Sequence, residues 1–145
     1  MEPICVKKLR PNAVLPTYGS AEAAGADLYA CLEEKIVIAP GQTAFIPTGL
    51  AMEIPKGCAG LICARSGLAC KRGLAPANKV GVIDSDYRGE FIVALHNHGS
   101  ESQTVLPGDR VAQLLIVPVF TPAYELCDEL TDTQRAGGGF GSTGK

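Results

Sequence analysis

The chain has 145 residues, of which 46% are hydrophobic and 19% are charged, and its formal net charge at pH 7 is -2. These values are typical of one globular domain, and the balanced charges, without a long run of either sign, argue against a nucleic-acid or anionic-membrane partner. No apolar stretch approaches the roughly 18 residues of a membrane span and the first residues lack the apolar core of a secretory signal, so the sequence predicts a cytoplasmic protein.

Short apolar runs recur along the chain, and Gly and Pro residues separate them at fairly regular intervals. This punctuation is typical of short β-strands joined by turns. Pro40-Gly41 and Pro107-Gly108 predict hairpin or corner turns. The predicted strands cover residues 4–9, 26–30, 35–38, 43–46, 49–54, 59–64, 80–83, 91–96, 103–106, 110–115 and 114–120. So many short strands indicate an all-β domain, a sandwich or a jelly roll.

One segment predicts a helix, and one predicts an arm without a core of its own. Ser66 is placed to cap a turn or two over residues 67–72, and Gly73 is placed to end it. The last eleven residues contain five glycines and a single large apolar side chain, Phe140, so they cannot fold by themselves. We therefore predict one domain over residues 1–133, followed by a flexible Gly-rich arm over residues 134–145.

The arm nevertheless has a composition suited to binding a nucleotide. Arg135 offers a guanidinium fork, Ser142 and Thr143 offer hydroxyls, and the glycine amides are free to converge on phosphate oxygens. Phe140 lies among them and has a ring that could stack on a base.

Three internal segments also carry polar residues where strands begin or end. Arg65 and Ser66 stand where a strand meets the short helix, which favours anion binding. Asp84 directly follows an apolar strand, so we predict that it ends a buried strand where a carboxylate needs a partner or a chemical role. Asp27 likewise stands alone at the start of an apolar strand.

Five segments occur in the order AGADLYA, ARSGLA, GVIDSDYRG, GDRVAQLL and RAGGGFGSTG, between about residue 16 and the C-terminus. Together they resemble the five motifs of the trimeric dUTPase family, the deoxyuridine triphosphate nucleotidohydrolases. Ala136 departs from the family, which usually has Gly there. The resemblance implies a distorted jelly roll or β-barrel of the dUTPase type, assembled as a homotrimer. It also implies hydrolysis of dUTP to dUMP and pyrophosphate with Mg²⁺, which limits uracil incorporation into DNA and supplies dUMP for thymidylate synthesis.

The resemblance further implies which residues select and attack the substrate. Asp84 would be the general base that deprotonates the water attacking the α-phosphate. Tyr87 would pack against the deoxyribose and leave no room for a 2′-hydroxyl. Uracil would be selected mainly by backbone groups of the hairpin around the third motif, which involves Asn78, Val82, Ile83 and Ile92.

Phosphate and metal binding are implied for the remaining motifs. Ser66 and Gly67, with the charge of Arg65, would bind the phosphates; Gln113 would lie beside metal-bound waters. Asp27 would hold a water that ligates Mg²⁺. In the family, the C-terminal motif of a third subunit closes over a site between two others. This implies substrate-binding roles for Arg135, Phe140, Gly141, Ser142 and Thr143, and Arg110 is expected to be an ion-pair partner.

Two alternatives use the same scaffold. A dCTP deaminase, mono- or bifunctional, would use a glutamate for proton transfer in the third motif, where this chain has Gly81-Val82-Ile83-Asp84. A non-catalytic nucleotide-binding module would be expected to lose Asp84, Ser66 or the arm, and this sequence contains all three.

Overall fold

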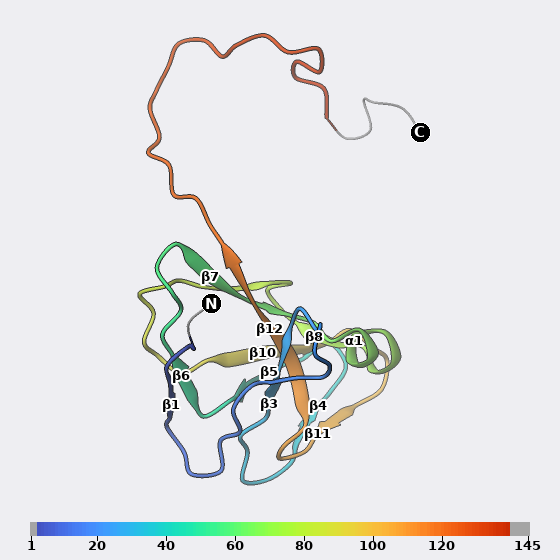
Figure 1. Ribbon diagram of the computed structural model, residues 1–145. Coiled ribbons are helices and arrows are strands. Elements are labelled where there is room, and N and C mark those ends of the chain that lie inside the picture. Colours follow the sequence, from blue (N-terminus) through green and yellow to red (C-terminus); the bar gives the residue numbers. More distant parts are fainter. Residues whose placement is uncertain (1–2, 140–145) are drawn as a thin grey trace.

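The computed structural model describes residues 3–139, and most of its regular structure is β-strand (Figure 1). Within residues 3–139 the strands form one body, and a single short helix lies at its side. In chain order the elements are β1 (Val6–Lys8), β2 (Thr17–Tyr18), β3 (Ala26–Tyr29), β4 (Ile36–Ile38), β5 (Thr43–Pro47), β6 (Leu50–Met52), β7 (Cys58–Cys63), α1 (Ser66–Arg72), β8 (Leu74–Pro76), β9 (Gly81–Ile83), β10 (Ile92–Asn97), β11 (Gln103–Val105) and β12 (Arg110–Pro118).

In the described part of the chain, the strands pair into four antiparallel sheets. The largest has the order β2-β3-β12-β7-β9, the second has the order β5-β10-β8, and the pairs β1-β6 and β4-β11 complete the body. Most neighbours within a sheet are not consecutive in the chain, so the connections cross from one sheet to another, as they do in a jelly roll. The predicted all-β class with one short helix is confirmed.

One hydrophobic core fills the body, and the strands reach it with every second residue. In β3, Ala26 and Leu28 are buried, and in β10 the buried residues include Val93 and Leu95. Alternate side chains of a strand point to opposite faces. Asp27 therefore lies on the outer face of the largest sheet, because both of its neighbours point into the core.

A β-bulge near the start of β12 adjusts which side chains face outward. The register between β12 and β3 shifts between Arg110 and Ala112. Val111 and Ala112 are consequently both buried, although they are adjacent in sequence. Bulges commonly redirect side chains beside functional sites. Here the bulge leaves Arg110 and Gln113 on the same outer face as Asp27.

The predicted elements differ from the structure in two places. Strands β2 and β8 have two and three residues and were not predicted, because neither lies in a longer apolar run and each owes its conformation to pairing, β2 with β3 and β8 with β10. The two overlapping strands predicted over residues 110–120 are one strand, β12. The turns predicted at Pro40-Gly41 and Pro107-Gly108 are both corners between sheets. The first joins β4, which pairs with β11, to β5, which pairs with β10; the second joins β11 to β12, which pairs with β3 and β7.

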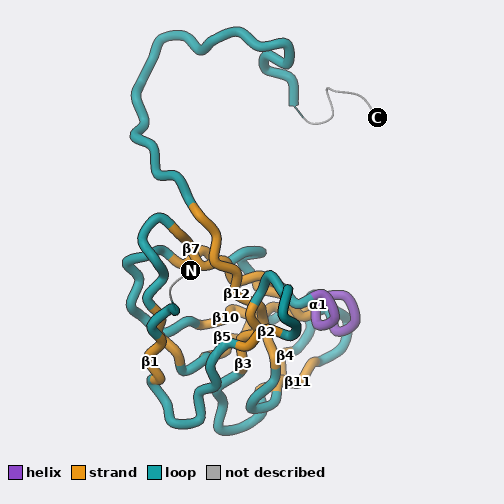
Figure 2. Tube along the Cα trace, viewed as in Figure 1, coloured by secondary structure: helices purple, strands orange, loops and turns teal. Residues whose placement is uncertain are grey.

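Residues 119–139 leave the body after β12 and form neither helix nor strand (Figure 2). We call this segment the arm base. Beyond Val119, its large apolar side chains are almost fully exposed, with values of 97% for Phe120, 98% for Tyr124, 99% for Leu126 and 86% for Leu130. The division into residues 1–133 and 134–145 stays a prediction. No helix among residues 3–139 is long and apolar enough to cross a membrane.

Candidate active site

A cleft of about 460 Å³ opens beside the outer face of the largest sheet. Its floor follows from strand register: Gln113 of β12 lies opposite Asp27 of β3 on one side and opposite Cys63 of β7 on the other. Side chains that are directly opposite in an antiparallel pair share a face. The cleft is lined by Gly19, Ala23, Gly25, Asp27, Arg65, Ser66, Gly67, Leu68, Arg72, Arg110 and Gln113.

Two arginines hold Asp27 at the centre of this cleft. Arg65 Nε donates to Asp27 Oδ1 at 2.7 Å, and Arg110 Nη1 donates to Asp27 Oδ2 at 3.1 Å. The Asp27 side chain is 13% exposed, so its charge is largely screened from water and needs these partners. A carboxylate has about four lone-pair sites, so each oxygen can still accept a bond from a water.

Gln113 is held beside Asp27 by a hydrogen bond to the backbone, and the lack of a side chain at Gly25 leaves room for its amide. Its Nε2 donates to the carbonyl oxygen of Ala64 at 2.9 Å. A Cβ atom at Gly25 would lie 2.5 Å from Gln113 Oε1, closer than carbon and oxygen can approach. Glycine at position 25 therefore lets the amide of Gln113 reach the cleft.

Helix α1 supplies the other wall of the cleft. It begins at Ser66, and its N-cap residue is Arg65, which makes no side-chain capping bond. The prediction that Ser66 is the cap is therefore wrong by one residue. Gly73 ends the helix as predicted, with a left-handed φ of 65°. Ser66 and Gly67 both line the cleft, as expected for residues that would meet phosphates.

Arg72 lines the same cleft, and the sequence analysis did not place it there. Its Nε donates to Gln103 Oε1 at 3.0 Å, and its Nη2 donates to the carbonyl oxygen of Thr104. Arg65, Leu68 and Arg72 are spaced three and four residues apart, so they share one side of the helix. That spacing is the signal in the sequence that could have identified Arg72.

The charges of the cleft favour an anion. Three arginines and one aspartate line it, which leaves an excess of positive charge. Its carboxylate and amide oxygens, the side-chain groups that suit a hard cation such as Mg²⁺, come from Asp27 and Gln113. Residues 3–139 contain no group of three or more His, Cys, Asp or Glu residues that could hold a metal alone. The donor set thus fits an ion that keeps most of its waters and binds chiefly through substrate phosphates.

The other predicted residues gather on a different part of the surface. Residues 81–92 run from β9 through a tight turn to the first residue of β10. We call them the Asp84 hairpin, although β9 and β10 pair with strands of different sheets, and they present Asp84, Tyr87 and Ile92 to solvent. Asp84 is exposed at the end of β9, so the expectation of a buried strand end is wrong. Val82 is also exposed, because it follows the buried Gly81 and so points to the outer face of the sheet, opposite Leu61. Asn78 lies close by, with its Nδ2 3.4 Å from the point that a Cβ atom at Gly81 would occupy.

Strand β7 separates the Asp84 hairpin from the cleft. Gly60 of β7 lies opposite Ile83, whereas Ile62 lies opposite Gly81, so the chain reaches Asp84 near the beginning of β7. Arg65 and Ser66 follow the end of β7. A strand rises about 3.3 Å per residue, which puts the level of Gly60 about 16 Å from that of Arg65. Asp84 and Arg65 therefore lie at opposite ends of β7 in one copy of the chain. Val82 and Asn78 lie nearer the cleft end, because Val82 is opposite Leu61 and Asn78 is beside Gly81, which is opposite Ile62.

The described part of the C-terminal motif lies apart from both sets of residues. Arg135 is exposed, and its Nε donates to the carbonyl oxygen of Gly138 at 2.9 Å. Ala136 has a left-handed φ of 43°, at a position where glycine would adopt this angle without strain. The predicted substrate-binding residues Phe140, Gly141, Ser142 and Thr143 lie outside the described residues.

Comparison with known proteins identifies relatives over nearly the whole chain. A family model described as dUTPase matches residues 11–144. The chain is 56% identical over 131 residues to a protein of Desulfitobacterium hafniense named deoxyuridine 5′-triphosphate nucleotidohydrolase, covering 90% of this chain and 87% of that protein. A protein of the same name from Syntrophotalea carbinolica is 49% identical over 141 residues, covering 97% of this chain and 96% of that protein.

Solved structures share the fold. The dUTPase of Staphylococcus bacteriophage 80alpha, solved with dUpNHpp, is 29% identical with a TM-score of 0.91, and the match covers 100% of both chains. A mutant dUTPase from phage phi11 of S. aureus is 28% identical with a TM-score of 0.78, covering 88% of this chain and 98% of that chain. Its structure is described as revealing the coordination of a structural Mg(II) ion.

Proposed function

The chain belongs to the dUTPase family, and from this we propose that its copies form a homotrimer. In this trimer, each active site combines the cleft of one copy with the Asp84 hairpin of another copy. The enzyme is a dUTP diphosphatase: it hydrolyses dUTP to dUMP and pyrophosphate. The observation that carries the shared site is the position of Asp84 and of the arginine-lined cleft at opposite ends of β7. A base must come within hydrogen-bond reach of the water that attacks a bound phosphate, which one copy alone does not achieve.

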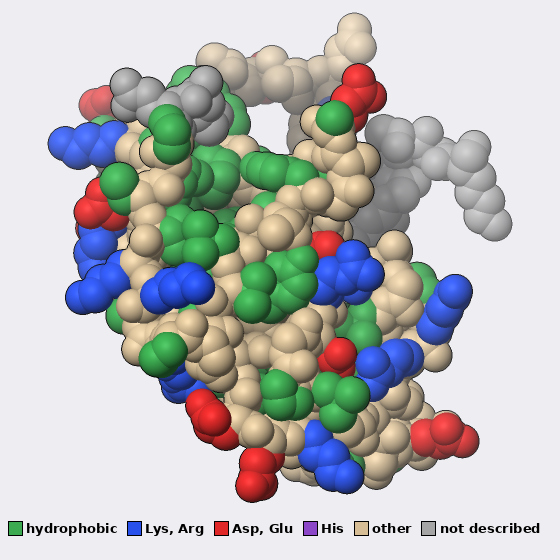
Figure 3. All heavy atoms as spheres, turned by 60° about the horizontal axis from the view of Figure 1, so that its bottom comes forward, with side chains coloured by type: hydrophobic (Ala, Val, Ile, Leu, Met, Phe, Trp, Pro, Cys, Tyr) green, Lys and Arg blue, Asp and Glu red, His purple; other side chains and the backbone are tan. Residues whose placement is uncertain are grey.

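Uncovered apolar surface supports association with further copies. A groove of about 490 Å³ is lined by apolar side chains of the N-terminal segment and the largest sheet, among them Ile4, Leu15 and Ile116. Hydrophobic side chains also lie open between basic ones on the face drawn in Figure 3. The arm base carries four large apolar side chains that find no core in its own copy. We propose that a neighbouring copy covers these surfaces, because contiguous exposed apolar area marks interaction sites.

Within the cleft, the three arginines neutralise the charge of the triphosphate. Arg65 and Arg110 are pre-oriented by Asp27, so little side-chain entropy is lost when substrate binds. Ser66 and Gly67 would add hydrogen bonds to the phosphates. A bound Mg²⁺ would supply further positive charge to the phosphate oxygens. Asp27 and Gln113 would hold its waters rather than the ion itself.

The residues of the Asp84 hairpin would act on the nucleoside part of dUTP and on the water that attacks its α-phosphate. Asp84 would orient the attacking water and take its proton, which typically contributes about 10² to 10⁴ in rate. The ring of Tyr87 would lie against the deoxyribose and exclude a 2′-hydroxyl. Asn78, Val82, Ile83 and Ile92 would surround the uracil, while Arg135 and residues 140–143 of a third copy would close the site.

Substrate selection can be tested with four nucleotides offered in parallel. The purified enzyme with Mg²⁺ should release pyrophosphate from dUTP and yield dUMP, while dCTP, dTTP and UTP react far more slowly, because each presents one wrong group to a fixed partner. Pyrophosphate release and chromatography of the products measure this. Release of ammonia from dCTP would contradict the proposal and favour a deaminase.

The shared site can be tested by mixing two inactive variants. Asp84→Asn removes the base from the hairpin, and Arg65→Ala removes a phosphate ligand from the cleft. In any mixed trimer, one of the three sites pairs an intact hairpin with an intact cleft. Random mixing in equal amounts should therefore restore about a quarter of the wild-type activity.

The control for this experiment carries both substitutions on one chain. Mixed with Asp84→Asn alone, this double variant leaves every site without a base and should restore nothing. Native mass spectrometry verifies that the trimers are mixed. Verified mixed trimers without recovered activity would contradict a site shared between copies.

A further inference from the structure

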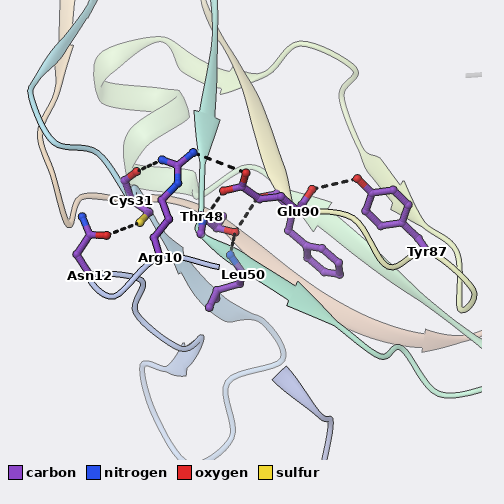
Figure 4. A network of polar contacts seen from close by, with 9 residues as sticks. Arg10, Asn12, Cys31, Thr48, Leu50, Tyr87 and Glu90 are labelled. Atoms are coloured by element: carbon purple, nitrogen blue, oxygen red, sulfur yellow. Dashed lines mark hydrogen bonds and ion pairs between the residues drawn. The ribbon is translucent and has the colours of Figure 1, made fainter. Parts of the chain in front are cut away.

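A corner between β5 and β6 holds the base of the Asp84 hairpin (Figure 4). The backbone amide of Gly49 donates to Glu90 Oε1 at 2.8 Å, and the amide of Phe91 donates to the carbonyl oxygen of Leu50 at 2.8 Å. The hydroxyl of Thr48 donates to the carbonyl oxygen of Phe91 at 2.7 Å. Thr48, Leu50 and Phe91 are fully buried. The hairpin is thus anchored at its C-terminal end by the Glu90 carboxylate, by the buried Phe91 side chain and by bonds to the backbone of Phe91, one of them from the Thr48 hydroxyl.

Glu90 also links this anchor to the N-terminal segment. Its Oε2 lies 3.8 Å from Arg10 Nη2, and Arg10 Nη1 donates to the carbonyl oxygen of Cys31 at 3.1 Å. The Glu90 side chain is 20% exposed, so the loss of its partners would leave a charge poorly solvated. Burial raises the pKa of the Cys31 thiol, so the thiol stays protonated and donates to Asn12 Oδ1 at 3.1 Å. Because this thiol is neutral, it adds no charge near Glu90. The carboxylate of Glu90 then has two partners, the Arg10 guanidinium and the Gly49 amide.

Tyr87 rests on the same piece of backbone. Its hydroxyl donates to the carbonyl oxygen of Glu90 at 3.1 Å, and its ring centroid lies 6.2 Å from that of the buried Phe91. A Cβ atom at Gly89 would collide with the Tyr87 hydroxyl and ring, so the ring lies directly over bare backbone. The depth of the Tyr87 ring is consequently set by the positions of residues 89–91. Figure 4 shows the chain of contacts from Arg10 through Glu90 to Tyr87.

We propose that Glu90 is a positioning residue for Tyr87, and that its carboxylate thereby controls how strictly the enzyme rejects a 2′-hydroxyl. The proposal rests on the proposed role of Tyr87 beside the sugar. Glu90 is not among the residues proposed to meet the base or the phosphates; its carboxylate bonds to the Gly49 amide and faces Arg10. It fixes the height of its own carbonyl oxygen, to which the Tyr87 hydroxyl is bonded. A shift of about 1 Å in the ring is enough to admit an additional oxygen atom, since catalytic geometry is sensitive on this scale.

The test compares kcat/KM for dUTP with kcat/KM for UTP in variants of Glu90. Glu90→Ala should lower the dUTP-to-UTP ratio by about tenfold, chiefly by raising kcat/KM for UTP, because the anchor loses a charge-assisted bond. Glu90→Gln keeps an acceptor for the Gly49 amide and should retain most of the ratio. A merely structural role would instead lower kcat/KM for both nucleotides equally, and that result would overturn the proposal.

Two further variants distinguish a change in the position of Tyr87 from a general loss of stability. Ile38→Val removes a methyl group from the core in the β4–β11 sheet, which contributes no residue to the hairpin. It should lower the melting temperature without changing the ratio. Tyr87→Phe keeps the ring but removes the bond to the Glu90 carbonyl oxygen, so it should shift the ratio in the same direction as Glu90→Ala even if Glu90→Ala folds poorly.

Tyr87→Ala separates this proposal from the one on which it rests. An unchanged ratio in Tyr87→Ala would mean that Tyr87 does not select the sugar. A collapsed ratio in Tyr87→Ala, with wild-type ratios in Glu90→Ala and Tyr87→Phe, would refute only the positioning role of Glu90.

Discussion

Replacing Asp84 by asparagine is expected to lower kcat for dUTP by about 10² or more while dUTP still binds. The amide has the size of the carboxylate but cannot take a proton from water. Among residues 3–139, no side chain bonds to the Asp84 carboxylate, and the turn is held through backbone, with the amide of Tyr87 donating to the Asp84 carbonyl oxygen at 3.1 Å. The substitution should therefore leave the hairpin intact.

Steady-state kinetics measure the fall in kcat, and calorimetric titration with dUpNHpp measures whether the nucleotide still binds. Asp86→Asn is the matched control, because Asp86 is an exposed carboxylate two residues away in the same hairpin. It should keep near-normal turnover. Near-normal turnover in Asp84→Asn, or an equal loss in both variants, would remove Asp84 from the role of base.

A chain that ends at Thr133 is expected to lose about a hundredfold in kcat/KM, since removing even one preorganised donor costs about 10² to 10³. The truncation removes Arg135 and the hydroxyls of Ser142 and Thr143, the groups proposed to meet the phosphates, and Phe140, proposed to cover the base. It keeps residues 119–133 of the arm base. These include the four exposed apolar side chains, from Phe120 to Leu130, that are proposed to pack on a neighbouring copy. The truncated chain should therefore still form trimers.

Light scattering coupled to size-exclusion chromatography measures the assembly, and pyrophosphate release measures the activity. A second chain, in which residues 134–145 are replaced by a Gly-Ala sequence of equal length, separates side-chain chemistry from length and should be as inactive as the truncation. Full activity in either chain would contradict the proposed role of the tail. Dissociation of the truncated chain would instead make residues 134–145 part of the interface.

The sequence predicted the elements whose signals are local. The helix over residues 66–72 was found because Gly73 supplies the left-handed residue that ends it, and the corners at Gly41 and Gly108 were found for the same reason. Strand β8 was missed because its three residues follow the helix directly and owe their conformation to pairing with β10. Such pairing is a long-range contact, which no local pattern encodes.

The site could be predicted only in part, for a similar reason. Asp27 and Gln113 were singled out by their motifs, but their meeting in one cleft depends on the register of β3 and β12. The bulge that places Arg110 beside them has no sequence signature of its own. The exposure of Asp84 and its distance from Arg65 follow from the antiparallel pairing of β7 with β9, which motif order does not reveal.

The position of β7 between hairpin and cleft has a consequence for newly synthesised protein. On the proposed division of the site, a single folded copy hydrolyses no dUTP, so activity begins only when copies meet. Dilution below the dissociation constant of the assembly switches the enzyme off without unfolding it, as mass action requires. The cell's supply of this activity then rises more steeply than the amount of chain it makes, and a small fall in expression lowers hydrolysis disproportionately.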